Sequence, residues 1–456
     1  MPVFNRRSFL AASAAAAVSP AFGAVRASSE VDIAIIGAGA AGIAAARKVA
    51  AAKRRFALIE AADHIGGRCV TDTQLFDVPF DRGAHWIHMP DINPLAMLAP
   101  QAGIEIYAAP PGQKVRIGRR YAREGELEDF LAALVRTQRA IGDAARRGDG
   151  SCAQALPKDL GEWRSTVEFV LGPFGCAKDL ADVSSLDFAR SAERDMDAFC
   201  RAGYGTLLAK LGDALPVQLG NPVTRIDWGG RGTIEVQLAK GRVVARAVIV
   251  TVSTGILTAD KIKFSPDLPR RYLDAASKLA LGSYDHIVIE LPGNPLGLQR
   301  DDLMFEKSET NRTAAVLANI SGTTLCMVDV AGKFGRSLAE RGEAAMVAFA
   351  LDWLGGLYGN DLRKAVKRTY ATRWNDDPWT LGAFSAAAPG AQSARKTLME
   401  SVNNRIWFAG EAAHETLWGT VGGAWESGER AAAEVLKRFG PPEPAVTRRK
   451  REVRSR

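Results

Sequence analysis

The hydrophobic pattern near the start of the chain predicts a strand, a tight turn, a helix and a second strand. Residues 31–36 are apolar apart from Asp32, a pattern that is typical of a parallel strand buried on both faces. A glycine-rich turn and an alanine-rich helix follow, as far as about residue 52. Residues 56–59 form a second apolar run that ends at Glu60. The pattern predicts an α/β fold that opens with a β–α–β unit.

The turn carries three glycines, Gly37, Gly39 and Gly42, whose spacing suits a bound dinucleotide. Gly37 permits the tight turn, Gly39 lets the backbone approach a pyrophosphate, and Gly42 lets the helix pack closely on the strand. Unpaired N–H groups at the helix start attract the anionic pyrophosphate, and Glu60 can accept hydrogen bonds from ribose hydroxyls. This pattern predicts dinucleotide binding without separating FAD from NAD.

Helical and alternating hydrophobic periods follow one another along the rest of the chain. Helices are predicted at residues 124–147, over much of 160–201, at 338–357 and at 423–439. Strands are predicted within residues 217–252, with a hairpin formed by 233–238 and 243–250, and at 286–291.

This order of elements predicts two domains, each built from discontinuous segments of the chain. A nucleotide-binding domain takes residues 28–110, 205–265 and 395–440. An α+β substrate-binding domain takes residues 111–204 and 266–394.

The net charge of +8 lies mostly at the two ends of the chain. Residues 1–27 hold three arginines and no acid, and residues 441–456 hold six basic side chains against two glutamates. The body between them is close to neutral, so it offers no electrostatic footprint for a nucleic-acid backbone. The basic end follows three prolines and is expected to be a solvated tail, with a membrane-surface or partner contact as the weaker alternative.

The cysteines are few and scattered, with neither a CxxC pair nor metal-ligand spacing. We therefore expect no metal site. The odd count argues against a full disulfide framework and leaves a single bridge open in an oxidising compartment. The five are Cys69, Cys152, Cys176, Cys200 and Cys326.

The first 27 residues resemble a twin-arginine export signal. Arg6 and Arg7 precede a mildly apolar, alanine-rich run, and small residues at Ala24 and Ala27 suit cleavage. We expect recognition by the twin-arginine export machinery and a periplasmic or secreted location. The apolar run is too short for a stable membrane span, and no other segment reaches about 18 apolar residues, so no stable membrane insertion is expected.

Further motifs occur in a fixed order between residues 63 and 428, and together they resemble the flavin-containing amine oxidase family of monoamine, polyamine and L-amino acid oxidases. The resemblance runs from about residue 31 to residue 432. It implies a Rossmann-type FAD-binding domain and an α+β substrate-binding domain. The motifs are DHIGGR from Asp63, FDRGAHWIH from Phe80, NPVTRI from Asn221, GAFS from Gly382, FAGEAAH from Phe408 and GTVGGAWESG from Gly419.

The resemblance also implies where FAD is held. Glu60 holds the adenosine ribose, Arg68 lies by the pyrophosphate and flavin, and Glu411 contacts the ribityl–pyrophosphate stretch. A helix begins at Thr420 and Val421, where a backbone N–H can stabilise negative charge on reduced flavin. The implied cofactor-binding residues are Gly37, Gly39, Gly42, Glu60, Gly67, Arg68, Val223, Glu411, Thr420 and Val421.

Within this family the resemblance implies oxidation of a small-molecule amine by hydride transfer to flavin N5, giving an imine that water hydrolyses. Ala383 stands where the monoamine branch has a tethering cysteine, so FAD is expected to be non-covalent. Phe384 supplies one ring of the aromatic sandwich around the amine, while Thr420 stands at the opposite position. Trp418 is a further candidate for that second ring.

Two histidines complete the predicted catalytic set of His88, His286, Phe384 and Thr420. His88 can accept a hydrogen bond from a substrate ammonium or keep it deprotonated. His286 stands where the family usually has a lysine that holds a water near the flavin. Because a histidine has a lower pKa and a shorter reach, the final electron acceptor is either O2 or another acceptor such as a quinone or cytochrome.

Two other functions remain open at this point. An L-amino acid oxidase would need an arginine to grip the substrate carboxylate, for which Arg82, Arg116 and Arg373 are candidates. A flavoprotein without catalysis is the other alternative.

Overall fold

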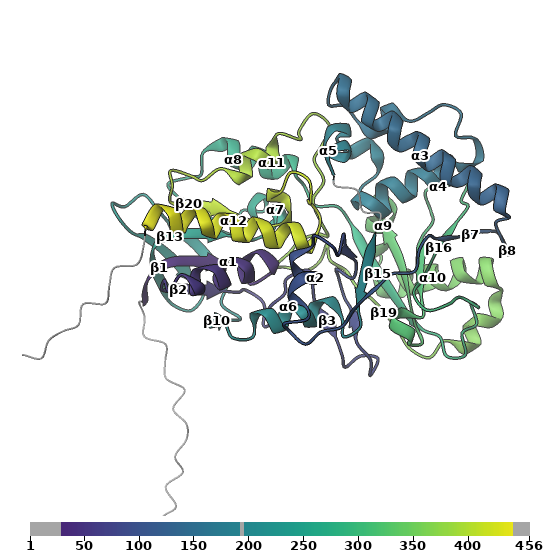
Figure 1. Cartoon of the computed structure of the whole chain (residues 1–456), viewed down its shortest axis with the longest axis horizontal. Helices are drawn as coiled ribbons and strands as arrows, with labels where there is room; N and C mark the ends of the chain where they lie inside the picture. The colour runs from purple at the N-terminus through teal and green to yellow at the C-terminus, as the bar shows by residue number, and fades with distance from the viewer. Residues whose placement is uncertain (1–28, 192–195, 441–456) are drawn as a thin grey trace, which may run out of the picture.

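Two β-sheets divide the molecule into two lobes (Figure 1). The structure is a computed structural model that describes residues 29–191 and 196–440. An eight-stranded sheet carries the N-terminal β–α–β unit and forms the nucleotide lobe, and a seven-stranded sheet forms the second lobe. This arrangement confirms the predicted fold class.

The nucleotide lobe is organised around β1 (Ser29–Ile36), which pairs in parallel with β2 (Phe56–Ile59) and with β13 (Arg242–Val250). β13 also pairs with β12 (Ile234–Leu238) as the predicted antiparallel hairpin, and in parallel with β20 (Ile406–Phe408). The nucleotide sheet thus joins segments that lie far apart in the sequence. Its other strands are β10 (Val217–Gln218), β11 (Val223–Asp227) and β14 (Lys263–Ser265).

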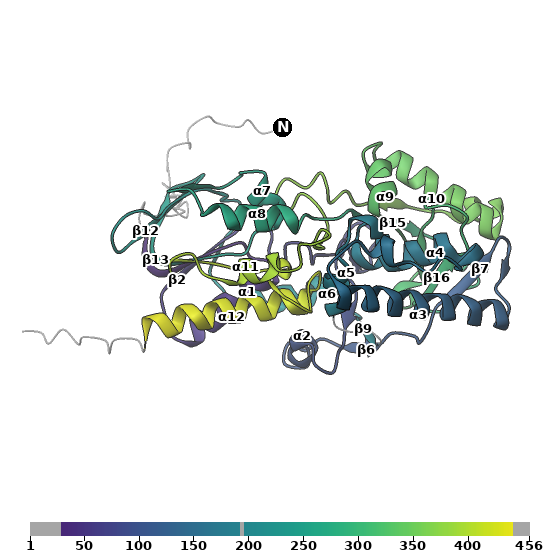
Figure 2. The ribbon, with the colours of Figure 1, turned by 90° about the horizontal axis from the view of Figure 1, so that it is seen from above.

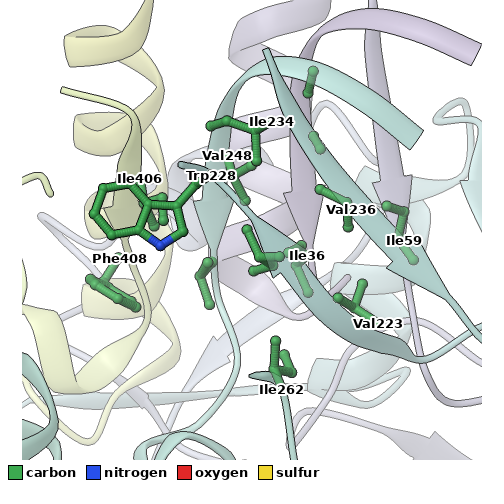
Figure 3. Close-up of a cluster of buried hydrophobic side chains, with 14 of the residues drawn as sticks. Ile36, Ile59, Val223, Trp228, Ile234, Val236, Val248, Ile262, Ile406 and Phe408 are labelled. Atoms are coloured by element: carbon green, nitrogen blue, oxygen red, sulfur yellow. The ribbon is translucent and has the colours of Figure 1, made fainter. Parts of the chain in front are cut away.

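The second half of β1 is apolar because both of its faces are covered. Ala34 and Ile36 enter one core, part of which Figure 3 shows, whereas Ile33 and Ile35 enter another. The second core contains side chains of α1 (Ala40–Ala51) and α12 (Val421–Phe439), which pack against each other. Burial on both faces explains the apolar residues 33–36 that identified the strand.

The second lobe is centred on β15 (Tyr284–Glu290), which is antiparallel to β18 (Leu325–Ala331) and to β19 (Thr369–Ala371). α9 (Gly332–Ala339) and α10 (Glu343–Tyr358) cover one face of this sheet. In Figure 2, α3 (Glu124–Arg147) and α4 (Arg164–Phe169) lie on the side away from α10. The remaining strands are β7 (Lys114–Ile117), β8 (Arg120–Tyr121), β16 (Asp302–Glu306) and β17 (Ala315–Ala318).

A small sheet links segments predicted to belong to different domains. β9 (Asp197–Cys200) pairs antiparallel with β5 (Ile87–His88) and with β6 (Ile106–Ala108). The loop after β5 leads into α2 (Pro94–Leu98). Shorter elements complete the fold: β3 (Thr71–Asp72), β4 (Phe80–Asp81), α5 (Ser185–Arg190), α6 (Tyr204–Gly212), α7 (Thr254–Thr258), α8 (Arg270–Lys278) and α11 (Ala394–Met399).

Three expectations need correction. The helical stretch expected over residues 160–201 is broken by turns and ends in β9, because pairing with distant strands decides that segment. The single helix expected at 338–357 is two helices, separated at Gly342, whose φ of 89° no helix accommodates. Tyr272 and Ala276 of α8 join the core of the nucleotide sheet, so the domain boundary lies after α8 rather than at residue 265.

Within the described ranges, no helix is both long and apolar enough to span a bilayer, and no group of His, Cys, Asp and Glu side chains could hold a metal ion. The predicted export signal and the basic tail lie outside the described residues.

Candidate functional site

The glycine turn has the geometry that a dinucleotide needs. Gly37 has a φ of +99°, which favours glycine, and a Cβ on Gly42 would lie 1.9 Å from the Gly37 carbonyl oxygen. α1 begins directly after Gly39, with neither a side-chain cap nor an acid in its first turn. The amide groups at this helix start therefore suit an anion.

Glu60 ends β2 beside this turn. Its Oε2 accepts a hydrogen bond from the Ala38 N–H at 2.6 Å, and its Oε1 accepts one from the Ala62 N–H at 2.9 Å. These bonds fix the carboxylate and leave lone pairs for ribose hydroxyls. The Glu60 carbonyl accepts the Asn221 N–H at 3.0 Å, which brings Val223, at the start of β11, near the same edge of the sheet.

Glu411 is the centre of a hydrogen-bond network. Its carboxylate accepts bonds from Arg68 Nη1 at 3.0 Å, from Ser385 Oγ at 2.7 Å and from the Gly419 N–H at 3.1 Å. Arg68 also donates to the Ala383 carbonyl. Glu411 is thereby surrounded by protein donors, so it positions three loops rather than offering its whole carboxylate to a ligand.

The Arg68 loop is held close to the glycine turn. Gly67 has a φ of +59°, and Gly66, beside it, forms a bridge with Gly39. Arg68 is one-quarter exposed while its guanidinium is tied to Glu411. The loop therefore presents a positioned cation beside the helix start, as a pyrophosphate requires.

Thr420 begins α12 as its N-cap. Its hydroxyl accepts the Gly423 N–H at 2.9 Å and donates to the Leu417 carbonyl at 2.7 Å. Because the Thr420 hydroxyl both donates and accepts a hydrogen bond in this cap, the side chain stabilises the start of the helix. Within the described residues no acceptor is assigned to the Val421 N–H, which leaves the positive end of α12 available to an anion.

Phe384 lies between the Gly419 turn and the second lobe. A Cβ on Gly419 would approach the Phe384 ring to 2.9 Å, so glycine is required there. The Tyr284 ring of β15 lies 6.0 Å from the Phe384 ring, centroid to centroid. Trp418 is buried, donates its indole N–H to the Asp187 carbonyl and lies under the Arg395 guanidinium. The aromatic neighbour of Phe384 is therefore Tyr284, which the motifs did not point to.

His88 forms a close pair with Asp197 across the β5–β9 ladder. Its Nδ1 lies 2.6 Å from Asp197 Oδ1, and both side chains are about one-fifth exposed, at 23% and 21%. The Asn93 side chain donates a hydrogen bond to the His88 carbonyl. The same side chain packs against Gly422, where a Cβ would come into close contact with it. These contacts place His88 next to the N-terminus of α12.

His286 is buried, and both of its ring nitrogens face acceptors. Nδ1 lies 2.6 Å from Asp329 Oδ1, and Nε2 lies 2.9 Å from the Gly83 carbonyl oxygen. The Tyr284 hydroxyl donates to the other Asp329 oxygen at 2.9 Å. A carbonyl oxygen accepts hydrogen bonds, and so does a carboxylate, so these two partners favour a ring that carries hydrogen on both nitrogens.

The direction of the His286 pKa shift also favours a charged ring. Burial opposes the charge, but the negative charge and hydrogen bond of Asp329 outweigh it, so the pKa of His286 is raised. On the same strand, burial raises the pKa of Asp285 to about 6. The Asp329 carboxylate therefore favours the charged form of His286 in a part of the sheet where burial opposes charge.

The three arginines considered for a substrate carboxylate each have another partner. Arg82 pairs with Asp72, and Arg373 pairs with Asp376 at 2.9 Å on the surface. The Arg116 guanidinium lies between two tyrosine rings. The described residues thus give no specific support for a carboxylate clamp at any of the three.

A second network, which motif reasoning missed, lies behind Glu411. Arg395 of α11 forms two bonds to Asp187 of α5, at 2.6 and 2.7 Å, and both side chains are fully buried. Arg395 also donates to the Ser385 hydroxyl at 3.3 Å. The pair joins the second lobe to the loop that carries Phe384. Neither residue stands out in the sequence, since Lys396 directly follows Arg395 and Arg190 lies three residues after Asp187.

These features fit FAD. The glycine turn and Glu60 suit the adenosine half, the Arg68 loop suits the pyrophosphate, and the start of α12 suits the anionic edge of a flavin. A dinucleotide lobe that faces a second sheet-based lobe defines a two-lobed flavoprotein oxidoreductase.

The chain belongs to the flavin-containing amine oxidase family, as residues 157–436 match the model described as flavin containing amine oxidoreductase. Residues 35–98 match an NAD(P)-binding Rossmann-like domain. This membership confirms the family resemblance, and the model that matches describes flavin-containing amine oxidoreductases.

Relatives and solved structures are similar over about nine-tenths of the chain. Polyamine oxidase 3 of Oryza sativa subsp. japonica is 26% identical, over 89% of this chain and 90% of its own length. Lysine-specific histone demethylase 1 homolog 2 of Arabidopsis thaliana is 27% identical over 89% of this chain, which spans only 58% of that relative.

Among solved structures, a putrescine oxidase bound to putrescine is similar in fold, with a TM-score of 0.77 and 21% identity over 90% of this chain and all of that one. Cyclohexylamine oxidase from Brevibacterium oxydans IH-35A gives a TM-score of 0.75 at 20% identity, over 90% of this chain and all of that one. The fold is therefore that of the amine oxidases.

Proposed function

We propose that this protein oxidises a primary or secondary amine, a polyamine or a monoamine, with non-covalent FAD and with O2 as the final electron acceptor. The observation that carries the proposal is the Glu411 network, which binds the Arg68 loop, the Phe384 loop and the Gly419 turn into one rigid frame. Such a frame suits a reaction in which orientation is the main demand on the protein.

FAD, when bound, would supply the hydride acceptor and the two electrons that reduce O2 to H2O2. The substrate amine loses a hydride from its α-carbon and a proton from nitrogen, and water hydrolyses the resulting imine. Phe384 and Tyr284 offer apolar faces on which a neutral amine can lie. Asp197 orients the His88 ring, which is positioned to take the proton of a substrate ammonium.

Ala383 supports non-covalent binding of the flavin. Its side chain is a buried methyl group, and its carbonyl accepts a bond from Arg68. All five cysteines lie at other positions in the chain, and each of them is buried. Flavin should therefore be released when the protein is denatured with acid.

The test is anaerobic titration of the purified holoenzyme with putrescine, spermidine, benzylamine, cyclohexylamine and two L-amino acids, followed by flavin absorbance. Bleaching by one of the amines is expected. Bleaching by the amino acids alone would favour an L-amino acid oxidase, and no bleaching by any compound would favour a flavoprotein without catalysis.

The electron acceptor is tested in the same samples. Re-admission of O2 should restore the flavin absorbance and yield H2O2 in proportion to the amine consumed. Slow recovery that a quinone or cytochrome accelerates would instead mark a dehydrogenase.

We further propose export by the twin-arginine route to the periplasm, on the basis of Arg6, Arg7 and the small residues before residue 28. Arg6→Lys with Arg7→Lys should retain the protein in the cytoplasm, whereas the matched change Arg26→Lys should not. Equal periplasmic recovery of both variants would contradict the proposal.

A further inference from the structure

One face of the second-lobe sheet carries the Tyr284 ring that lies near Phe384. Residues two apart in a strand share a face, so Tyr284 and His286 of β15 lie on the same face as Val288. Ile287 points to the other face, into the core under α9 and α10. We call the first of these the Tyr284 face. Because the Tyr284 and Phe384 ring centroids are 6.0 Å apart, this face begins at the proposed amine position.

The neighbouring strands continue the Tyr284 face in two rows of cross-strand partners. One row runs from Val288 of β15 across β18 and β17 to β16, and the other runs from His286 across the same strands. Asp329 stands opposite His286, and the remaining members of both rows are apolar. These apolar members are Val288, Met327, Leu317, Leu303, Ala315 and Phe305.

The charged groups on the Tyr284 face are already paired. His286 and Asp329 lie 2.6 Å apart. Glu290, at the far end of β15, is bound by Arg368 at 2.6 Å and by Lys367 at 3.2 Å. Among the residues of β15, β16, β17 and β18, this face has no other acid. A second ammonium group on a substrate would therefore find no unpaired carboxylate on these strands.

Aromatic rings continue from Phe384 along the Tyr284 face. The Phe174 ring lies 6.1 Å from the Tyr284 ring and packs edge-on against the Phe305 ring at 5.0 Å. Phe384, Tyr284 and Phe174 are each partly exposed, whereas Phe305 is buried. A row of partly exposed rings offers edges and faces to the ring of a ligand.

The segment that carries Phe174 has an unusual backbone. Phe174 ends a π-helical turn, η3 (Val170–Phe174), a rare geometry that is frequent at functional sites. This turn directly follows α4, which lies on the side of the sheet away from α10 (Figure 2). Phe174 is thus held over the Tyr284 face by a segment of the second lobe.

Leu303 extends the apolar surface in the other direction. It is partly buried and packs against both the core around Phe305 and the core around Phe199. In the second of these cores, the Trp86 ring lies 4.7 Å from the Phe199 ring. Trp86 precedes His88 by two residues. The apolar surface therefore extends from Phe384 toward the segment that carries the proposed proton acceptor.

We infer that the substrate is a monoamine whose one amino group is attached to an apolar, ring-bearing substituent, and that Phe174 and Leu303 contact this substituent. The inference rests on the proposed amine oxidation and names the substrate class of that site. A diamine or polyamine would bring a second ammonium against apolar side chains, and burying an unpaired charge is costly. Asp197 of β9, which lies outside this sheet, is engaged by His88 at 2.6 Å.

The test is anaerobic stopped-flow mixing of the holoenzyme with three amines, which gives the second-order rate constant of flavin reduction for each. Hexylamine and 1,6-diaminohexane have the same carbon chain and differ by the second amino group. Hexylamine should reduce the flavin at least about tenfold faster, because the diamine must bury a second charge. 2-Phenylethylamine should react about three- to tenfold faster than hexylamine, because aromatic contacts add to the burial of area.

Phe174→Leu tests the contact with the substrate ring. It should slow reduction by 2-phenylethylamine about three- to tenfold and reduction by hexylamine less than about twofold. The matched control is Phe334→Leu, since Phe334 packs against Phe349 at 4.9 Å on the α9 and α10 side of the sheet. The control should leave the ratio of the two rate constants unchanged.

Leu303→Asp tests the missing carboxylate. It places an acid on the Tyr284 face and should narrow the difference between hexylamine and 1,6-diaminohexane about fivefold, as a partly exposed ion pair allows. Leu303→Asn has nearly the same shape without the charge and should leave the difference as it is. Bound flavin absorbance reports folding in every variant, and the comparison of amines in the unchanged protein depends on none of them.

Equal or faster reduction by 1,6-diaminohexane than by hexylamine in the unchanged protein would overturn this inference and leave amine oxidation intact. Equal effects of Phe174→Leu and Phe334→Leu on the ratio would overturn the contact assigned to Phe174. Failure of every amine to reduce the flavin would instead overturn the proposed function, and this inference with it.

Discussion

At the scale of single residues, the structure shows hydrogen bonds of the motif residues that the motifs themselves could not specify. Glu411 is a hub for protein donors, and Thr420 is a helix cap. The His286 ring lies between Asp329 and a backbone carbonyl. Each assignment follows from the partner atoms, since the number of donors and acceptors on a side chain is fixed by its chemistry.

Replacing Glu411 with Ala should yield protein with much less bound flavin. The change leaves Ser385 and Gly419 with unpaired donors and frees Arg68, and each buried unpaired group costs about 1–3 kcal/mol. We expect at least about tenfold weaker flavin binding, measured by fluorescence titration of the apoprotein. Glu426→Ala, on the partly exposed face of α12, is the control. Full flavin occupancy in the Glu411 variant would refute the assignment.

His286 should make reoxidation of the reduced protein dependent on pH. Because Asp329 raises the pKa of His286 over the opposing effect of burial, the ring is charged at low pH and loses its charge as pH rises through that raised pKa. The rate with O2 should therefore fall as pH rises through the same pKa. The His286–Asp329 pair should also contribute to the free energy of unfolding in a pH-dependent way. This contribution is fully present below about pH 6.5 and is lost as pH rises through the raised pKa.

His286→Lys should speed reoxidation and extend it to higher pH, because lysine has a longer reach and an ordinary pKa of about 10.4. His286→Gln, which carries no charge, should slow it. Stopped-flow mixing of reduced protein with O2 measures both. Identical rates in all three proteins would show that the position does not influence the reaction with oxygen.

At the scale of elements, the local hydrophobic pattern was sufficient to predict those helices and strands whose own sequence decides their secondary structure. The bounds of α3 agree with the expected helix at 124–147, and β12 with β13 forms the expected hairpin. The local pattern was insufficient where pairing with a distant segment decides the secondary structure. β9 is a strand because it completes ladders with β5 and β6, which lie about 90 residues or more earlier in the chain.

The cap of α12 provides a test at this scale. Thr420→Val removes the hydroxyl that accepts the Gly423 N–H and should cost about 1 kcal/mol of unfolding free energy. Thr420→Ser keeps the cap and should lie close to the unchanged protein. Urea denaturation of both variants measures the difference. Equal stability of all three proteins would mean that the cap contributes nothing.

At the scale of the whole molecule, two lobes are joined by buried polar contacts as well as by apolar packing. Arg395 and Asp187 are both fully buried and come from different segments of the chain. Their pairing holds α5 of the second lobe against the loop that carries Phe384. The site therefore depends on how the lobes dock, which no single segment encodes.

Asp187→Asn should be strongly destabilising, by about 3–5 kcal/mol, because it leaves the buried Arg395 charge without its partner. Asp143→Asn breaks an exposed ion pair on α3 and should cost less than about 1 kcal/mol. Denaturant midpoints with unchanged slopes give both values. Similar losses of unfolding free energy in the two variants would show that the buried pair contributes no more to stability than the exposed pair.

The sequence by itself determined the β–α–β unit, the glycine turn, α3 and the family, because these depend on local periodicity and on motifs within short windows. Only the tertiary structure decided the charge of His286, the neighbour of Phe384 and the Arg395–Asp187 pair. Their partners lie 43 residues away for Asp329, and 208 residues apart for Arg395 and Asp187. Such contacts form only when distant strands and helices pack, so no local pattern carries them.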